Sequence, residues 1–146
     1  MKKTMLWMGS SILLLAACNG GSDASEVDRL REEAIAVHDE IMPQISAFDR
    51  NTVKIDSLLA HLPQLKEAYP DMDTVQTRTE LTALKNRLEQ ATGSMMDWMT
   101  EFDVDPQDKS TDEIKAYYEA EVKKVKDMKQ LFEEVSKEST DKLAQF

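Results

Sequence analysis

Residues 26–62, EVDRLREEAIAVHDEIMPQISAFDRNTVKIDSLLAHL, place an apolar side chain at every third or fourth position. This spacing is the period of an α-helix with one buried face. The residues of this seam are Val27, Leu30, Ala34, Val37, Ile41, Ile45, Phe48, Thr52, Ile55, Leu59 and Leu62. They predict one long helix.

Two further seams follow along the chain. The second runs from Leu81 to Phe102 and the third from Ile114 to Val135, with Phe146 in phase, and no strand-like alternation competes with them. Prolines between residues 61 and 73 and a polar stretch at 103–110 separate the seams. We therefore expect an all-α fold, an antiparallel three-helix bundle of long, coiled-coil-like helices over about 26–62, 74–102 and 111–146. Self-association as a coiled coil is the alternative.

The first 18 residues, MKKTMLWMGSSILLLAAC, have two lysines, an apolar run and small residues before a cysteine. This order is typical of a secretory signal peptide, and it is too short for a membrane span. The ending LAAC resembles the bacterial lipobox, in which the cysteine receives lipid and becomes the first mature residue. The resemblance implies a signal peptide over 1–17, lipidation of Cys18 and a lipidated tether over 18–25. An ordinary secretory peptide with an incidental cysteine is the alternative.

The lipid anchor would place the protein in the bacterial cell envelope. Cys18 is the only cysteine, so a lipidated chain has no thiol left for a disulfide or a metal. Asn19 stands where, in the best-known sorting rule, an aspartate retains lipoproteins at the inner membrane. We therefore expect an outer-membrane lipoprotein that faces the periplasm, with exposure at the cell surface left open.

The chain is strongly acidic, with 18 Lys+Arg against 28 Asp+Glu. Cleavage before Cys18 would remove two lysines and no acid, which lowers the net charge from −10 to −12. Such a chain repels nucleic acid and anionic lipid, so the lipid itself must hold it at the membrane. The expected partners are an unknown envelope protein or a second copy, and no nucleic acid.

An antiparallel bundle brings residue 38 of the first helix level with about residue 98 of the second. The same reasoning places the start of the third helix at this height. The predicted layer of polar, aromatic and methionine side chains consists of His38, Met42, Met95, Trp98, Met99, Tyr118 and Glu121, with Tyr117 beside Tyr118.

Two interpretations of this layer stay open. In the first it is structural: His38 bonds to Glu121, a tyrosine hydroxyl or the carbonyl of Asp39, and no cofactor is bound. In the second, a soft ligand set binds Cu(I) or haem. The ligands would be His38, Met42, Met95 and Met99. We expect no enzyme, because the only nucleophile near His38 is Ser94, on a helix instead of a strained turn.

Pro43 interrupts an otherwise continuous helical pattern. If the helix continues through it, the proline removes the bond to the carbonyl of Asp39 and costs about 3 kcal/mol. The same antiparallel alignment places it opposite Gly93, whose lack of a side chain would accommodate a bend. In the alternative, Pro43 begins a new helix.

Three motifs resemble a family of small Bacteroidetes lipoproteins, often labelled "viral A-type inclusion protein". The motifs are HDEIMP at 38–43, MMDWMTEF at 95–102 and YYEAEVKKVKDM at 117–128. The resemblance implies a lipoprotein with a helical bundle. Because the family has no established activity, it carries no catalytic residue to this chain.

Overall fold

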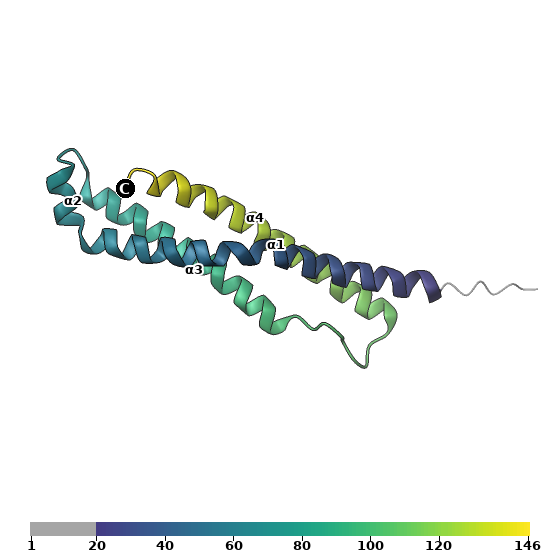
Figure 1. Cartoon of the computed structure of the whole chain (residues 1–146). Coiled ribbons are helices and arrows are strands. Elements are labelled where there is room, and N and C mark those ends of the chain that lie inside the picture. The colour runs from purple at the N-terminus through teal and green to yellow at the C-terminus, as the bar shows by residue number, and fades with distance from the viewer. Residues whose placement is uncertain (1–19) are drawn as a thin grey trace, which may run out of the picture.

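The computed structural model describes residues 20–146, which form an all-α bundle. In this range the helices are α1 (Gly20–Ala60), α2 (Leu62–Ala68), α3 (Thr74–Glu101) and α4 (Thr111–Leu143), and there is no strand. The long helices α1, α3 and α4 run beside one another in alternating directions, and the short α2 lies at the turn from α1 to α3 (Figure 1). The predicted antiparallel bundle is confirmed.

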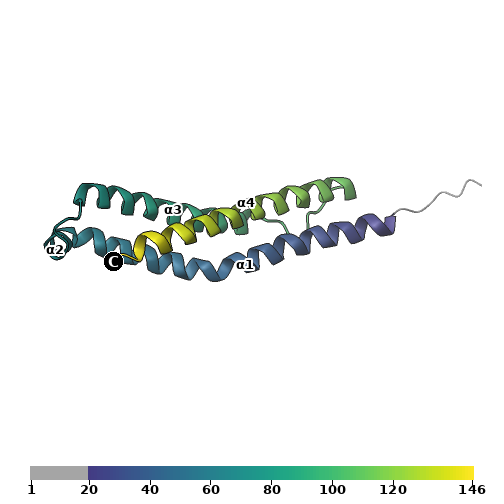
Figure 2. The same ribbon diagram turned by 90° about the horizontal axis from the view of Figure 1, so that it is seen from above.

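The core follows the three apolar seams. Residues such as Ile41, Leu88 and Val125 are fully buried. Phe48 of α1 stacks on Phe132 of α4 with ring centroids 4.8 Å apart. α1 extends along the whole rod (Figure 2), which at 1.5 Å per residue is about 60 Å. None of the helices in residues 20–146 has the length and apolar character of a membrane span.

Side chains cap the N-termini of α3 and α4. The carboxylate of Asp73 accepts from the backbone N–H groups of Val75 and Gln76 at the start of α3. At the start of α4, Ser110 and Glu113 form a capping box. These side chains satisfy N–H groups that have no partner inside the helix.

The helix boundaries differ from the predicted ones at both ends of α1. Residues 20–25 are helical, so the prediction of a tether over 18–25 is wrong for this part. The acid in the first turn, Asp23, favours the positive end of the helix dipole at this end of α1. α1 ends at Ala60, and Leu62 belongs to α2. The predicted signal peptide over 1–17 and Cys18 lie outside the described residues.

Pro43 lies inside α1, which continues through it. The interpretation in which Pro43 begins a new helix is therefore wrong. The predicted partnership with Gly93 is also not found, because a Cβ on Gly93 would meet no heavy atom within 4 Å. Packing against α1 therefore does not require a glycine at this position.

Candidate functional site: the groove beside His38

His38 of α1 and Trp98 of α3 lie against each other, at the level that the antiparallel alignment predicts. Their rings stack with centroids 5.6 Å apart and planes inclined by 29°. Trp98 also stacks on Phe102, at 4.5 Å between centroids. The end of α3 is thus an aromatic cluster packed on the middle of α1.

Glu121 of α4 is buried beneath this cluster, with 4% of its surface exposed. Its carboxylate accepts from the indole N–H of Trp98 at 2.8 Å and from the ammonium of Lys124 at 2.7 Å. The hydrogen bond to Glu121 raises the pKa of Lys124 above its ordinary value. The buried carboxylate therefore has a neutral donor and a cation, which offset the cost of removing it from water.

The two tyrosines at the start of α4 hold the loop of residues 102–110. The hydroxyl of Tyr118 donates to the carbonyl of Val104 at 2.9 Å. The hydroxyl of Tyr117 accepts from the backbone N–H of Asp103 at 2.7 Å. Burial raises the pKa of both phenols above the ordinary value of 10.0. Tyr118 and Glu121 therefore serve the loop and Trp98, and neither bonds to His38.

His38 has one bonded and one unbonded ring nitrogen. Its Nδ1 lies 2.9 Å from a carboxylate oxygen of Asp39, the next residue. Because a carboxylate only accepts, Nδ1 must carry the proton, and in the neutral ring Nε2 keeps a free lone pair. Nε2 is buried without a hydrogen-bond partner in the described part of the chain. The predicted bonds from His38 to Glu121, a tyrosine hydroxyl or the carbonyl of Asp39 are wrong, because among the described residues the ring bonds only to the carboxylate of Asp39.

The methionines of the predicted layer do not lie in one place. Met95 is fully buried in the core, and Met42 is partly buried against it. Met99 is 42% exposed, so it does not lie in the core with Met95. Trp98 occupies the core-facing position, and the next residue in a helix is rotated away by about 100°.

Met99 instead lines an open groove with His38. The groove has a volume of about 330 Å³, and we call it the His38 groove. Its lining residues are Ile35, His38, Asp39, Trp98, Met99, Phe102 and Val104. Sequence reasoning missed Ile35, Phe102 and Val104 as site residues. One signal in the sequence could have indicated the groove: Val104 is the one aliphatic side chain in the polar stretch 103–110.

The His38 groove exposes apolar surface. Ile35, Met99 and Val104 are 37%, 42% and 56% exposed, and Met96 lies one turn before Met99 with 51% exposed. Large exposed apolar side chains gathered in one place are typical of interaction surfaces. Among residues 20–146, no three histidine, cysteine or acidic side chains gather in a way that could hold a metal ion.

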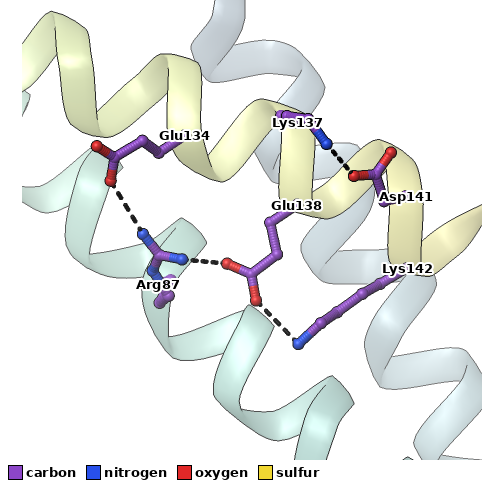
Figure 3. A pocket seen from close by; sticks show the side chains of 6 residues that line it. All are labelled: Arg87, Glu134, Lys137, Glu138, Asp141 and Lys142. Carbon is purple, nitrogen blue, oxygen red and sulfur yellow. Dashed lines mark hydrogen bonds and ion pairs between the residues drawn. The ribbon is translucent and has the colours of Figure 1, made fainter.

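A second hollow, of about 450 Å³, lies between α3 and α4 and has a different character (Figure 3). Its lining consists of charged side chains: Arg87, Glu134, Lys137, Glu138, Asp141 and Lys142. Arg87 pairs with Glu134 and Glu138, and Glu138 also pairs with Lys142. The hydrogen bond from Lys142, with help from Arg87, lowers the pKa of Glu138. Because its charges already pair with one another, this hollow is a solvated ion-pair network.

Comparison of the whole chain with protein-family models, with curated proteins and with solved structures finds no match.

Proposed function

We propose that this protein is a lipid-anchored helical bundle of the bacterial cell envelope and that it acts as a protein-interaction module, not as an enzyme. The observation that carries the interaction role is the His38 groove, where Ile35, Met99 and Val104 are exposed side by side. The location rests on the lipobox-like ending at Cys18 and on the resemblance to Bacteroidetes lipoproteins. The acidic chain agrees with a membrane attachment that depends on lipid.

The polar groups near the groove support a role without catalysis. The hydroxyl of Ser94 donates to the carbonyl of Ala91 on its own helix. The proton-bearing nitrogen of His38 faces Asp39 and no serine or threonine. Acyl transfer requires a nucleophile paired with a base, and Ser94 and His38 do not form such a pair.

The anchor is tested by mass spectrometry of the full chain expressed in a bacterium with lipoprotein-processing enzymes. We expect the mature terminus at Cys18, with a diacylglyceryl thioether and an acylated amine. Cys18→Ala should stay uncleaved and unlipidated, whereas Asn19→Asp should remain lipidated and shift toward the inner membrane. An unmodified Cys18, or a mature terminus elsewhere, would refute the location.

The interaction role is tested by a photo-crosslinking amino acid placed at single exposed positions in living cells. Positions 99 and 104 should give protein adducts of defined mass. Positions 53 and 75 are matched controls, because Val53 and Val75 are 69% and 76% exposed and lie outside the groove. Equal labelling at all four positions, or none at 99 and 104, would count against the role.

A Cu(I) or haem site is the second candidate function. It is favoured by the buried, unbonded Nε2 of His38, which shares its groove with the thioether of Met99. Metal content and visible absorbance of purified protein test it, with His38→Ala and Met99→Leu as ligand-free variants. Metal well below one ion per chain after incubation with Cu(I), and no haem absorbance after incubation with haem, would remove this candidate.

A further inference from the structure

The bundle is incomplete at the end where α1 begins. α3 ends at Glu101, beside residues 35–39 of α1, whereas α1 begins at Gly20. Beyond the end of α3, the loop of residues 102–110 crosses to the start of α4 (Figure 1). The residues that meet there are Ala24, Val27 and Arg31 of α1, Pro106 of the loop, and Ile114 and Tyr118 of α4. A loop therefore takes the place of a third helix at this end, and the His38 groove lies where α3 stops.

The side chains of the groove suit a helical ligand. Met99 and the neighbouring Met96 are flexible and polarizable, and methionines of this kind adapt to varied apolar partners. Trp98 and Phe102 give the groove a rigid aromatic floor. An apolar groove between helices commonly accepts the apolar face of an amphipathic helix.

The rim of the groove is negatively charged. Asp39 lines it, Asp103 precedes Val104 in the loop, and Glu32 lies one turn before Ile35 on α1. Within residues 20–146 none of these three carboxylates has a lysine or arginine at ion-pair distance.

Other acids of α1 do have such partners. Glu33 and Glu40 face α4 and pair with Lys126 and Lys129. The excess negative charge on this part of α1 and the loop thus lies beside exposed apolar surface. A cationic ligand with an apolar face would be complementary to both features.

We propose that the His38 groove docks a short basic amphipathic helix of a partner protein, at the place where α3 ends. This inference rests on the proposed function as an interaction module and names its partner class. A second copy, cleaved before Cys18, would bring a net charge of −12 and the same acidic rim, so like charges oppose self-docking. Anionic lipid is opposed for the same reason.

Trp98 provides the readout for the test. The chain has two tryptophans, and Trp7 precedes the bundle, so a protein of residues 20–146 has Trp98 alone. The buried core runs from Leu30 to Leu143, so this protein contains the whole bundle. The probe is a synthetic peptide of about 14 residues with leucine and lysine at helical spacing, which forms about four turns. The control peptide has glutamate in place of lysine.

We expect a saturable change in Trp98 emission with the lysine peptide and none with the glutamate peptide. Met99→Ser and, separately, Val104→Ser should weaken binding about tenfold, since each removes exposed apolar contact. Val75→Ser, outside the groove, should bind like the wild type. Added salt should weaken binding, and the double variant Glu32→Gln with Asp103→Asn should show less of this salt dependence.

Several outcomes would overturn the inference. These are no emission change, equal binding of the glutamate peptide, or binding that Met99→Ser and Val104→Ser leave unaltered while circular dichroism shows both folded. Self-association of residues 20–146 that Met99→Ser abolishes would assign the groove to a second copy instead. The titration contains no lipid, so it is independent of the anchor. An unlipidated Cys18 refutes the proposed location alone, and a failed titration refutes the partner class alone.

Discussion

The indole N–H of Trp98 donates a 2.8 Å hydrogen bond to the carboxylate of Glu121, and this bond joins the end of α3 to α4 inside the bundle. The side chain of Trp98 thereby closes the core and also forms part of the floor of the His38 groove. A buried polar pair of this kind favours one register between two helices that apolar contacts alone would leave free to slide.

Replacement of Glu121 should therefore destabilise the bundle. Glu121→Leu leaves the indole N–H without an acceptor, which should lower the free energy of unfolding by about 1–3 kcal/mol. Glu121→Gln keeps an acceptor and should cost less. Urea unfolding followed by circular dichroism measures both, with the exposed Glu119→Leu as the matched control. Equal stability of Glu121→Leu and the wild type would show that Trp98 does not depend on this carboxylate.

Replacement of the His38 imidazole by a ring without nitrogen should not destabilise the bundle. Nε2 makes no hydrogen bond among the described residues, while the ring stacks on Trp98. His38→Phe keeps the stacking and should be neutral or stabilising, whereas His38→Ala removes it and should cost about 1–3 kcal/mol. Urea unfolding of the two variants separates these effects. A large loss with His38→Phe would mean that the ring nitrogens matter for stability.

The fold could be predicted because its determinants are local and periodic. The seam through Ile41 and Phe48 specifies a helix from residue spacing alone, and Ser110 with Glu113 marks where α4 begins. Short connections then require antiparallel neighbours, which places His38 beside Trp98. Each step uses sequence distances of a few residues or simple counting along a helix.

The site could be predicted only in part, because its details depend on side-chain direction. Counting along a helix gives the height of Met99 but not its outward direction, which follows from Trp98 taking the core position. The partner of Glu121 depends on which of several neighbours at one height reaches the carboxylate. The groove exists because α3 ends far from the beginning of α1. The predicted helix ends already implied this difference in length, but not that Val104 of the following loop would line the groove.

Acid should weaken the bundle through its capping and ion-paired carboxylates. Backbone hydrogen bonds from Gln76 and Val75 lower the pKa of Asp73 below its ordinary 3.8, and the hydrogen bond from Lys126 lowers that of Glu33 below 4.5. A lowered pKa in the folded state gives stability that is present above the ordinary value and is lost as pH falls through the lowered one. We therefore expect urea midpoints that are level from about pH 5 to 8 and decrease below about pH 4.5.

Asp73→Asn is the control for this pH dependence. Asparagine also caps helices but does not titrate, so the variant should lose part of the decline at acid pH while α3 still forms. Midpoints for the variant and the wild type are compared over the same pH series. An identical decline in both proteins would exclude Asp73 as a source of the acid sensitivity.

Removal of Pro43 should stabilise the bundle. Pro43 is exposed inside the continuous α1, so Pro43→Ala restores the N–H that can bond to the carbonyl of Asp39. The cost of proline in a helix interior is about 3 kcal/mol, and the freer unfolded chain of the variant offsets up to about 1 kcal/mol of the gain. We expect a net gain of about 2–3 kcal/mol in urea unfolding. A loss would mean that the packing of α1 on α4 requires the shape that the proline imposes.

Gly93→Ala should stabilise the protein without altering its packing. Gly93 is inside α3, and a Cβ there would meet no heavy atom within 4 Å. Alanine restricts the unfolded chain more than glycine and favours the helix by about 1 kcal/mol. Urea unfolding should show a gain of about this size, and Trp98 emission should stay unchanged because its surroundings do not move. A loss of stability would mean that the added methyl group meets a neighbour, and that the small residue accommodates α1 after all.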